Sequence, residues 1–188
     1  IEEKGGTLTI DASHLEFDNI DRKASEATRA SLLLLGALAG RAQSYKLYKS
    51  GGCRLGERTV RPHVFALEKF GVRVESREEY YKVTNSKLKA VEITMYESGD
   101  TPTENAVMTA ATAPGTTIIR MASANYMVQD LCHFLIKAGS EIEGVGTTTL
   151  TIHGVKSLRP VDDFKIMPDP IVAMTFISAA IATESHLT

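Results

Sequence analysis

The sequence predicts an α/β protein, and three observations support this prediction. Apolar segments with helical spacing alternate along the chain with short segments rich in β-branched and aromatic residues. The order helix, strand, helix and three strands recurs after roughly 70 residues. A helix expected over 30–39 is apolar on nearly every face, so it must be buried on all sides. We therefore expect helices packed together inside and sheets outside.

The first copy of this repeated unit begins with a helix over residues 25–40. Ser25 is its expected N-cap and Gly40 lies at its end. In the second helix of this copy, expected over 60–71, Pro62 suits the first turn and Gly71 suits the end. The other elements of this copy are expected at 44–48 (strand), 60–71 (helix), 72–76, 80–84 and 90–96 (strands).

The second copy repeats this order, and a third copy begins near the end of the chain. The third copy starts in "PDPIVAMTFISAAIATESHLT", where Asp169 and Pro170 are helix-start signals. A strand pair expected in 5–13 would belong to an earlier unit, so each unit can be written β-α-β-α-β-β. The elements of the second copy are expected at 103–115 and 125–139 (helices) and at 116–121, 140–144, 147–154 and 163–167 (strands).

Composition and charge argue against several classes of partner. The formal net charge is −2, whereas nucleic-acid-binding domains usually show a strong basic excess. The longest apolar run, 32–38, is far shorter than the roughly 20 residues that span a membrane. The sequence has no paired Cys and His spacing of the zinc type. We expect no nucleic acid, no membrane and no metal.

The chain has no signal-peptide pattern and does not begin with methionine, so we expect a segment of a longer cytoplasmic protein. Cys53 and Cys132 do not suggest a disulfide framework and fit a reducing compartment. We expect residues 1–166 to form one domain whose first unit is incomplete. Residues 167–188 would begin the next unit.

Cys53 is the first candidate functional residue. It follows two glycines in the basic segment "KSGGCRLGERTVRPH", residues 49–63. Glycine lets the backbone move or approach a ligand closely, and the cations Lys49, Arg54 and Arg58 would lower the pKa of the thiol. The alternative is a loop cysteine without a function.

Arg29 is the second candidate, because it lies near the start of a helix that is otherwise expected to be buried. A cation there opposes the helix dipole unless an anion is bound as well. A helix start with an arginine suits a phosphate or carboxylate. The alternative is a surface arginine whose head extends into water. Cys132, by contrast, has the helical spacing of a core residue.

Four segments of the chain carry a resemblance to a known family: "TRASLLLLGALAG", "GGCRLGERTVRPH", "TENAVMTAATAPGTTII" and "MPDPIVAMTFISAAIA". They resemble the UDP-N-acetylglucosamine enolpyruvyl transferases, also called UDP-N-acetylglucosamine 1-carboxyvinyltransferases. The resemblance covers almost the whole chain. Its most specific part is the cysteine segment, since sister enzymes that make 5-enolpyruvylshikimate 3-phosphate share the fold without it.

The resemblance implies an inside-out α/β barrel built from repeated β-α-β-α-β-β units, with two such domains closing on substrate. It implies transfer of the enolpyruvyl group of phosphoenolpyruvate to the 3'-hydroxyl of UDP-N-acetylglucosamine, with release of phosphate. This is the first committed step of peptidoglycan precursor synthesis, and no cofactor is implied. The segment alone is expected to be inactive, because one domain cannot close a dry site around the reacting atoms.

The resemblance also implies roles for individual residues. Cys53 would be the general acid toward the enolpyruvyl methylene, can form an adduct with phosphoenolpyruvate, and would be the residue that fosfomycin alkylates. Arg58 would meet phosphate and substrate, and Arg29 would lie at the nucleotide-sugar site. Further substrate contacts are implied for Thr59, Val60, Arg61, Pro62, Gly99 and Asp100.

Three segments depart from the family pattern. "TVRP" replaces P-V-D-L, so Arg61 stands where an aspartate is expected; residues 124–127 replace R-E-P-E; and 168–172 replace P-D-R-I-E. These departures keep two alternatives open: a non-catalytic paralogue that binds a nucleotide sugar or regulates a partner, and the same chemistry on another acceptor. The family's lysine–asparagine pair for phosphoenolpyruvate would lie before Ile1, and its base for the sugar hydroxyl after Thr188.

Overall fold

The computed structural model describes residues 1–49 and 59–187, and these form an α/β fold, as the sequence predicts. The strands are β1 (Glu2–Lys4), β2 (Thr7–Thr9), β3 (Ser44–Tyr48), β4 (Val72–Ser76), β5 (Tyr80–Asn85), β6 (Glu92–Thr94), β7 (Gly115–Arg120), β8 (Glu141–Glu143) and β9 (Thr149–Gly154). The helices are α1 (Arg22–Ala27), the 3₁₀ helix η1 (Arg29–Leu33), α2 (Leu34–Ala37), α3 (Arg61–Phe70), α4 (Asp100–Ala110), α5 (Tyr126–Lys137) and α6 (Pro170–Ala182).

The strands form two main sheets and a separate hairpin. One sheet has the order β3-β5-β4 and is antiparallel throughout. The other has the order β6-β7-β9-β8, in which β6 and β7 are parallel and the other pairs antiparallel. The elements β6, α4, β7, α5, β8 and β9 thus give one complete β-α-β-α-β-β unit, in agreement with the predicted repeat.

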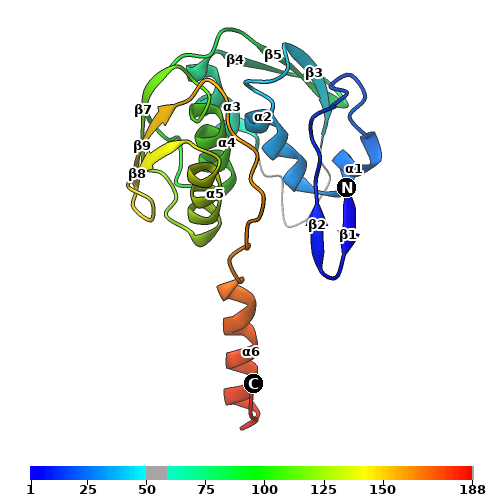
Figure 1. Cartoon of the computed structure of the whole chain (residues 1–188), viewed down its shortest axis with the longest axis vertical. Coiled ribbons are helices and arrows are strands. Elements are labelled where there is room, and N and C mark those ends of the chain that lie inside the picture. Colours follow the sequence, from blue (N-terminus) through cyan, green and yellow to red (C-terminus); the bar gives the residue numbers. More distant parts are fainter. Residues whose placement is uncertain (50–58, 188) are drawn as a thin grey trace.

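Two apolar clusters join the helices to the sheets. One cluster packs η1, α2 and α3 against the β3-β5-β4 sheet, and Leu35, Leu47 and Leu67 lie in it. The other packs α3, α4 and α5 against the second sheet, around Val107 and Ile119. Helix α4 contacts α2, α3 and α5, so the helices gather together and the sheets flank them (Figure 1).

The predicted helix over 25–40 is wrong in its start and its continuity. Asp21, not Ser25, is the first cap, and its carboxylate accepts from the Ala24 amide at 2.6 Å. Thr28 is extended, with φ −139° and ψ 140°, and its hydroxyl accepts from the Ala30 amide at 3.2 Å. Two caps seven positions apart compete with one continuous helix, so the chain forms α1 and then starts again as η1 and α2.

The predicted strand at 163–167 is also wrong. This stretch is irregular, and the Met167 amide donates to both carboxylate oxygens of Asp130 at 3.3 Å. A side chain on α5 therefore supplies the partner that a neighbouring strand would have supplied. The strand predicted over 90–96 forms only over Glu92–Thr94.

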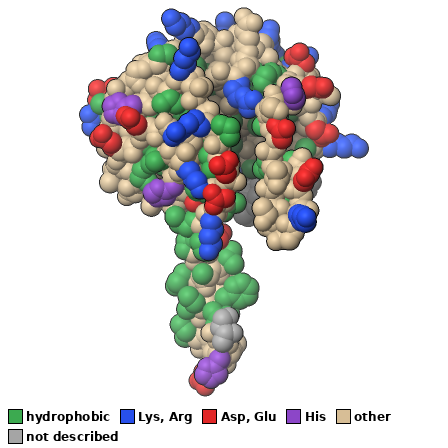
Figure 2. Space-filling view, viewed as in Figure 1, with side chains coloured by type: hydrophobic (Ala, Val, Ile, Leu, Met, Phe, Trp, Pro, Cys, Tyr) green, Lys and Arg blue, Asp and Glu red, His purple; other side chains and the backbone are tan. Residues whose placement is uncertain are grey.

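Helix α6 begins where the sequence predicts, with the Asp169 carboxylate accepting from the Ile171 amide at 2.8 Å. It extends away from the rest of the chain, and none of its residues is buried (Figure 1). Apolar side chains cover its surface in the space-filling view (Figure 2). Phe176 is 59% exposed and Ile181 74% exposed. No helix in the described part of the chain is long and apolar enough to cross a membrane.

Candidate functional site

The described candidate residues lie at the starts of three helices. Arg29 is the first residue of η1. Thr59 and Val60 come directly before α3, which Arg61 and Pro62 begin; Gly99 caps α4, and Asp100 is its first residue. Cys53 and Arg58 lie outside the described residues, so their predicted roles stay predictions.

Thr59 joins the start of η1 to the start of α3. The Arg29 Nη2 donates to the carbonyl oxygen of Thr59 at 3.4 Å. The hydroxyl oxygen of Thr59 accepts from the Arg61 amide at 3.1 Å. The structure therefore brings together Arg29 and the segment 59–61, two regions that the sequence analysis singled out separately.

The side chain of Arg61 lies against an aromatic ring. Its guanidinium carbon is 5.3 Å from the centre of the Tyr96 ring, and Tyr96 is 49% exposed. Phe65, one turn further along α3, has its ring centre 5.8 Å from that of Tyr96. A guanidinium over an aromatic face is stabilised by the negative charge of the ring face. The charge reversal at position 61 is thus accommodated by Tyr96.

A buried polar network lies beneath these helix starts. Asn105 of α4 donates from Nδ2 to the Leu32 carbonyl at 3.1 Å and to Nδ1 of His63 at 2.8 Å, and its Oδ1 accepts from the Gly36 amide at 2.7 Å. Nδ1 of His63 is therefore the acceptor, and Nε2 carries the proton, 3.4 Å from the Thr101 hydroxyl. This one network connects η1, α2, α3 and α4.

His63 is held in its neutral form. Burial lowers its pKa to about 4, and the positive charge of Arg29 acts in the same direction. The sequence analysis did not single out His63 or Asn105. One sequence signal could have found them: each is a polar residue at a position where the helical pattern of α3 or α4 requires a core residue.

The Asp100 carboxylate is hydrogen-bonded to the segment before α5. Its Oδ1 accepts from the Ser123 hydroxyl at 2.5 Å and its Oδ2 from the side-chain Nδ2 of Asn125 at 3.0 Å, at the start of α5. Glu104, one turn along α4, is 7% exposed, and its pKa is raised by burial and by the nearby Asp100. Asp100 therefore links α4 to the start of α5, and Glu104 is buried close to it.

Cys132 is buried on α5, as predicted, and burial raises the pKa of its thiol to about 11. A thiol that stays protonated at neutral pH is a poor nucleophile. Cys132 therefore provides an inert reference for experiments on Cys53.

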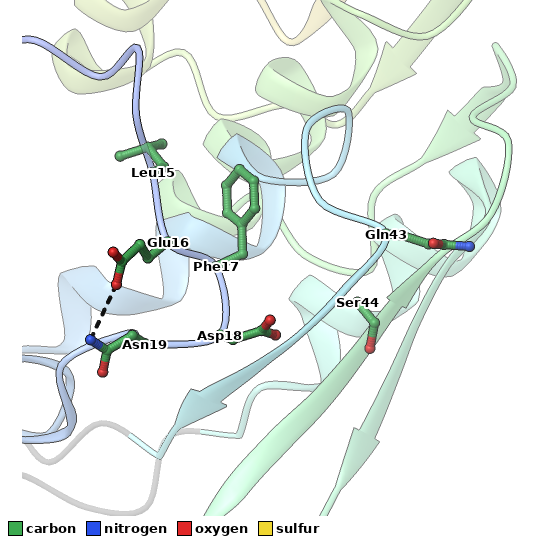
Figure 3. A pocket seen from close by; sticks show the side chains of 7 residues that line it. All are labelled: Leu15, Glu16, Phe17, Asp18, Asn19, Gln43 and Ser44. Carbon is green, nitrogen blue, oxygen red and sulfur yellow. Dashed lines mark hydrogen bonds between the residues drawn. The ribbon is translucent and has the colours of Figure 1, made fainter.

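A surface pocket of about 600 Å³ lies elsewhere, between the segment Leu15–Asn19 and the start of β3 at Gln43 and Ser44 (Figure 3). Asn19 donates to Glu16 at 3.4 Å along one wall. None of the predicted site residues lines it, and its charged side chains are Glu16 and Asp18, which disfavour an anion. Within residues 1–49 and 59–187, no group of three or more His, Cys, Asp and Glu side chains could hold a metal ion.

The geometry of the helix starts suits an anionic ligand. The Arg29 guanidinium reaches the Thr59 carbonyl, and the adjacent histidine is neutral, so the positive charge here is carried by a group that stays protonated at all ordinary pH values. Guanidinium groups are suited to phosphate and carboxylate oxygens. This end of the helix layer is therefore a candidate site for a phosphate-bearing substrate.

Comparison with known proteins defines the class. A family model described as EPSP synthase (3-phosphoshikimate 1-carboxyvinyltransferase) matches residues 1–188, and the chain belongs to this family. Within it, the chain is 36% identical to the UDP-N-acetylglucosamine 1-carboxyvinyltransferase of Hydrogenovibrio crunogenus, over 96% of this chain and 43% of the relative. The protein of that name from Desulfatibacillum aliphaticivorans is 38% identical over 100% of this chain and 45% of its own. The resemblance stated from the sequence is confirmed.

Solved structures agree with this assignment. The enolpyruvyl transferase NikO from Streptomyces tendae superposes with a TM-score of 0.76 and 26% identity, over 90% of this chain and 40% of that one. An EPSP synthase from Acinetobacter baumannii gives a TM-score of 0.59 at 15% identity, over 79% of this chain and 34% of that one, and so supports the fold alone. The chain spans less than half the length of these relatives.

Proposed function

We propose that the protein containing this chain transfers the enolpyruvyl group of phosphoenolpyruvate to the 3'-hydroxyl of UDP-N-acetylglucosamine. The observation that carries the proposal is the identity of 36–38% with proteins named for this reaction, over nearly the whole chain. The product is an enol ether and the leaving group is inorganic phosphate. The reaction would take place in the cytoplasm, as the first committed step of peptidoglycan precursor synthesis.

The roles proposed for individual residues follow the order of bond changes. Cys53 gives a proton to the enolpyruvyl methylene while the sugar hydroxyl adds to the neighbouring carbon. Loss of phosphate and of one proton from the methyl group so formed then restores the double bond. Arg58 contacts the phosphate, and Arg29 contacts the nucleotide sugar. The contact between Arg29 and Thr59 supports placing the nucleotide sugar beside the start of α3.

The experiment that tests the proposal is turnover by the full-length protein, measured as phosphate released from phosphoenolpyruvate when UDP-N-acetylglucosamine is added. Fosfomycin treatment followed by peptide mass spectrometry tests Cys53. We expect an adduct at Cys53 and none at Cys132, because the Cys132 thiol is buried and protonated. A Cys53→Ser variant should lose the adduct. Labelling at Cys132 alone, or at neither cysteine with the nucleotide sugar present, would contradict the assignment.

We also propose the domain arrangement that the resemblance implies. Residues 1–166 would form most of an inside-out barrel domain, and 167–188 would begin the next unit at the crossover to a second domain. The exposed apolar surface of α6 supports this arrangement, because a helix that is apolar on all faces requires neighbours on all sides. The second domain would complete the dry site that the chemistry needs.

A different acceptor is the second candidate function, and Arg61 is the observation that favours it. An arginine side chain only donates hydrogen bonds, whereas an aspartate accepts them, so a ligand group that contacts the side chain at position 61 would have to be an acceptor or an anion. Titration of the full-length protein with UDP-N-acetylglucosamine separates the candidates. No binding would favour another acceptor or a non-catalytic paralogue, and phosphate release with another nucleotide would then select the former. If an Arg61→Asp variant gains affinity for UDP-N-acetylglucosamine, Arg61 is the cause.

A further inference from the structure

Asn105 lies where α4 meets the helix starts of the candidate site. It is 0% exposed, on a helix that contacts both α2 and α3 (Figure 1). Two backbone groups fix the orientation of its side-chain amide. The Gly36 amide can only donate, to Oδ1 at 2.7 Å, and the Leu32 carbonyl can only accept, from Nδ2 at 3.1 Å. The remaining N–H donates to Nδ1 of His63 at 2.8 Å, so the three bonds go to α2, η1 and α3.

These hydrogen bonds close a ring beneath the candidate site. Arg29 begins η1 and donates to the carbonyl of Thr59, directly before α3. Leu32 lies three residues after Arg29 in η1, and His63 lies in the first turn of α3. Asn105 joins these two residues from the interior. The ring therefore runs from η1 through the start of α3 to α4 and back to η1.

The buried side of this ring is its stronger side. The contact between Arg29 and Thr59 is 3.4 Å long, near the limit for a hydrogen bond. The bonds of Asn105 are 2.7–3.1 Å long and lie in the interior, where the low local dielectric strengthens them. The Asn105 amide is thus the main restraint on the distance between η1 and the start of α3.

We propose that Asn105 is a positioning residue for the nucleotide sugar. It holds Arg29 at a fixed distance from the start of α3, so that both meet the ligand without rearrangement, and it acts from the interior without touching the ligand. Binding groups that are already in place lose less conformational entropy on binding and so give a higher affinity. The proposal rests on the proposed function, in which Arg29 contacts the nucleotide sugar.

The test compares two buried asparagines in the full-length protein. Asn85 is the matched control, because its side-chain amide also donates to backbone carbonyls in the interior, those of Leu38 at 3.2 Å and Ala42 at 2.6 Å. These partners lie at the end of α2 and after it, not at the helix starts of the candidate site. Asn105→Ala and Asn85→Ala would each be titrated with UDP-N-acetylglucosamine by calorimetry, at a temperature at which both are folded.

We expect Asn105→Ala to raise the Kd for UDP-N-acetylglucosamine about tenfold or more, because part of the binding free energy would be used to bring η1 and α3 together. Asn85→Ala should stay within about twofold of the wild type, since a distant site acts independently. In turnover, the KM of Asn105→Ala for the nucleotide sugar should rise by a larger factor than kcat falls. A residue that only stabilised the fold would lower the Tm and leave both the Kd and this KM unchanged.

A second pair of variants tests the same ring at His63. His63→Leu removes the acceptor for the Asn105 amide, whereas His63→Gln offers a carbonyl oxygen in its place. We expect His63→Leu to weaken binding of the nucleotide sugar about threefold or more, the effect of losing one hydrogen bond. His63→Gln should restore most of the affinity. This pair decides on the proposal if Asn105→Ala does not fold, and equal affinity of the two variants would then overturn it.

The outcomes separate this proposal from the proposed function. Unchanged affinity of Asn105→Ala, or equal weakening in Asn85→Ala, would overturn the positioning role while wild-type turnover still upholds the reaction. If the wild type does not bind UDP-N-acetylglucosamine, the proposed function fails, and the same variants are titrated with inorganic pyrophosphate. Pyrophosphate binding that is weakened in Asn105→Ala and not in Asn85→Ala then supports the ring as the support of an anion site. Any other result with pyrophosphate overturns it.

Discussion

Among single residues, His63 is the one whose protonation would most directly change the candidate site. It is 2% exposed and neutral, with its Nδ1 accepting from Asn105 and Arg29 near enough to disfavour a second proton. A protonated His63 would lose this hydrogen bond, because Nδ1 would become a donor facing a donor. The starts of η1, α3 and α4 are held together through this histidine, so its protonation would loosen the candidate site.

We predict that, because of His63, the free energy of unfolding begins to fall at a higher pH than the titration of carboxylates alone would cause. Its pKa falls from 6.5 in the unfolded chain to about 4 in the folded one. The unfolded state therefore binds more protons between these values, and stability is lost as the pH falls from 6.5 through 4. The loss is on the order of 3 kcal/mol. Urea unfolding at several pH values measures it.

The matched variant for this prediction is His63→Gln. Glutamine offers the Asn105 amide a carbonyl oxygen but does not titrate. Its free energy of unfolding should be lower than that of the wild type at pH 7.5, and the difference should shrink at pH 4.5. Parallel curves for the two proteins over this range would show that His63 is not responsible.

At the scale of elements, the contact between α2 and α4 depends on Gly36. A Cβ at this position would lie 2.5 Å from the carbonyl oxygen of Asn105, a backbone atom that cannot rotate away. Alanine normally stabilises a helix by about 1 kcal/mol over glycine, but here the helices would have to separate. We predict that Gly36→Ala lowers the free energy of unfolding by roughly 1–3 kcal/mol in denaturant titrations.

Gly40→Ala is the control for this prediction. A Cβ at Gly40 would meet the Thr112 hydroxyl at 2.6 Å, and this is a side-chain atom that can change rotamer. The loss of stability should therefore be smaller than for Gly36→Ala. Equal or greater stability of Gly36→Ala than of the wild type would show that the close approach is not needed.

The sequence predicts elements well where local signals agree. In α3, Pro62 in the first turn and Gly71 with φ 101° mark both ends correctly, and Asp169 marks the start of α6. The prediction fails at Thr28, because a continuous apolar pattern hides a cap that interrupts the helix. It also misses the link between His63 and Asn105, since residues far apart in the sequence carry no local signal of their contact.

At the scale of the whole molecule, helix α6 is exposed in this chain, whereas the proposed domain arrangement would bury it in the full-length protein. Ile177 is 40% exposed here, and the helix around it has no buried residue. In the 188-residue chain we predict that Ile177→Asp changes the free energy of unfolding by no more than about 0.5 kcal/mol. In the full-length protein the same substitution would bury a charge and cost several kcal/mol.

Comparison of the two unfolding experiments therefore tests the proposed domain arrangement. A small effect in both proteins would mean that α6 remains exposed and that residues 167–188 do not begin a packed unit. The 188-residue chain should also release no phosphate from phosphoenolpyruvate with UDP-N-acetylglucosamine, because one domain alone cannot enclose the reacting atoms. Turnover by this chain would contradict that expectation.

The Asn105 network also has a consequence for the order of folding. Its hydrogen bonds join residues separated by 69, 73 and 42 positions in the sequence, to Gly36, Leu32 and His63 respectively. Contacts of such long range close large loops and tend to form late. Asn105→Ala should therefore accelerate unfolding much more than it slows refolding, as stopped-flow measurements would show. The helix starts that form the candidate site would then be assembled last, after both sheets have formed.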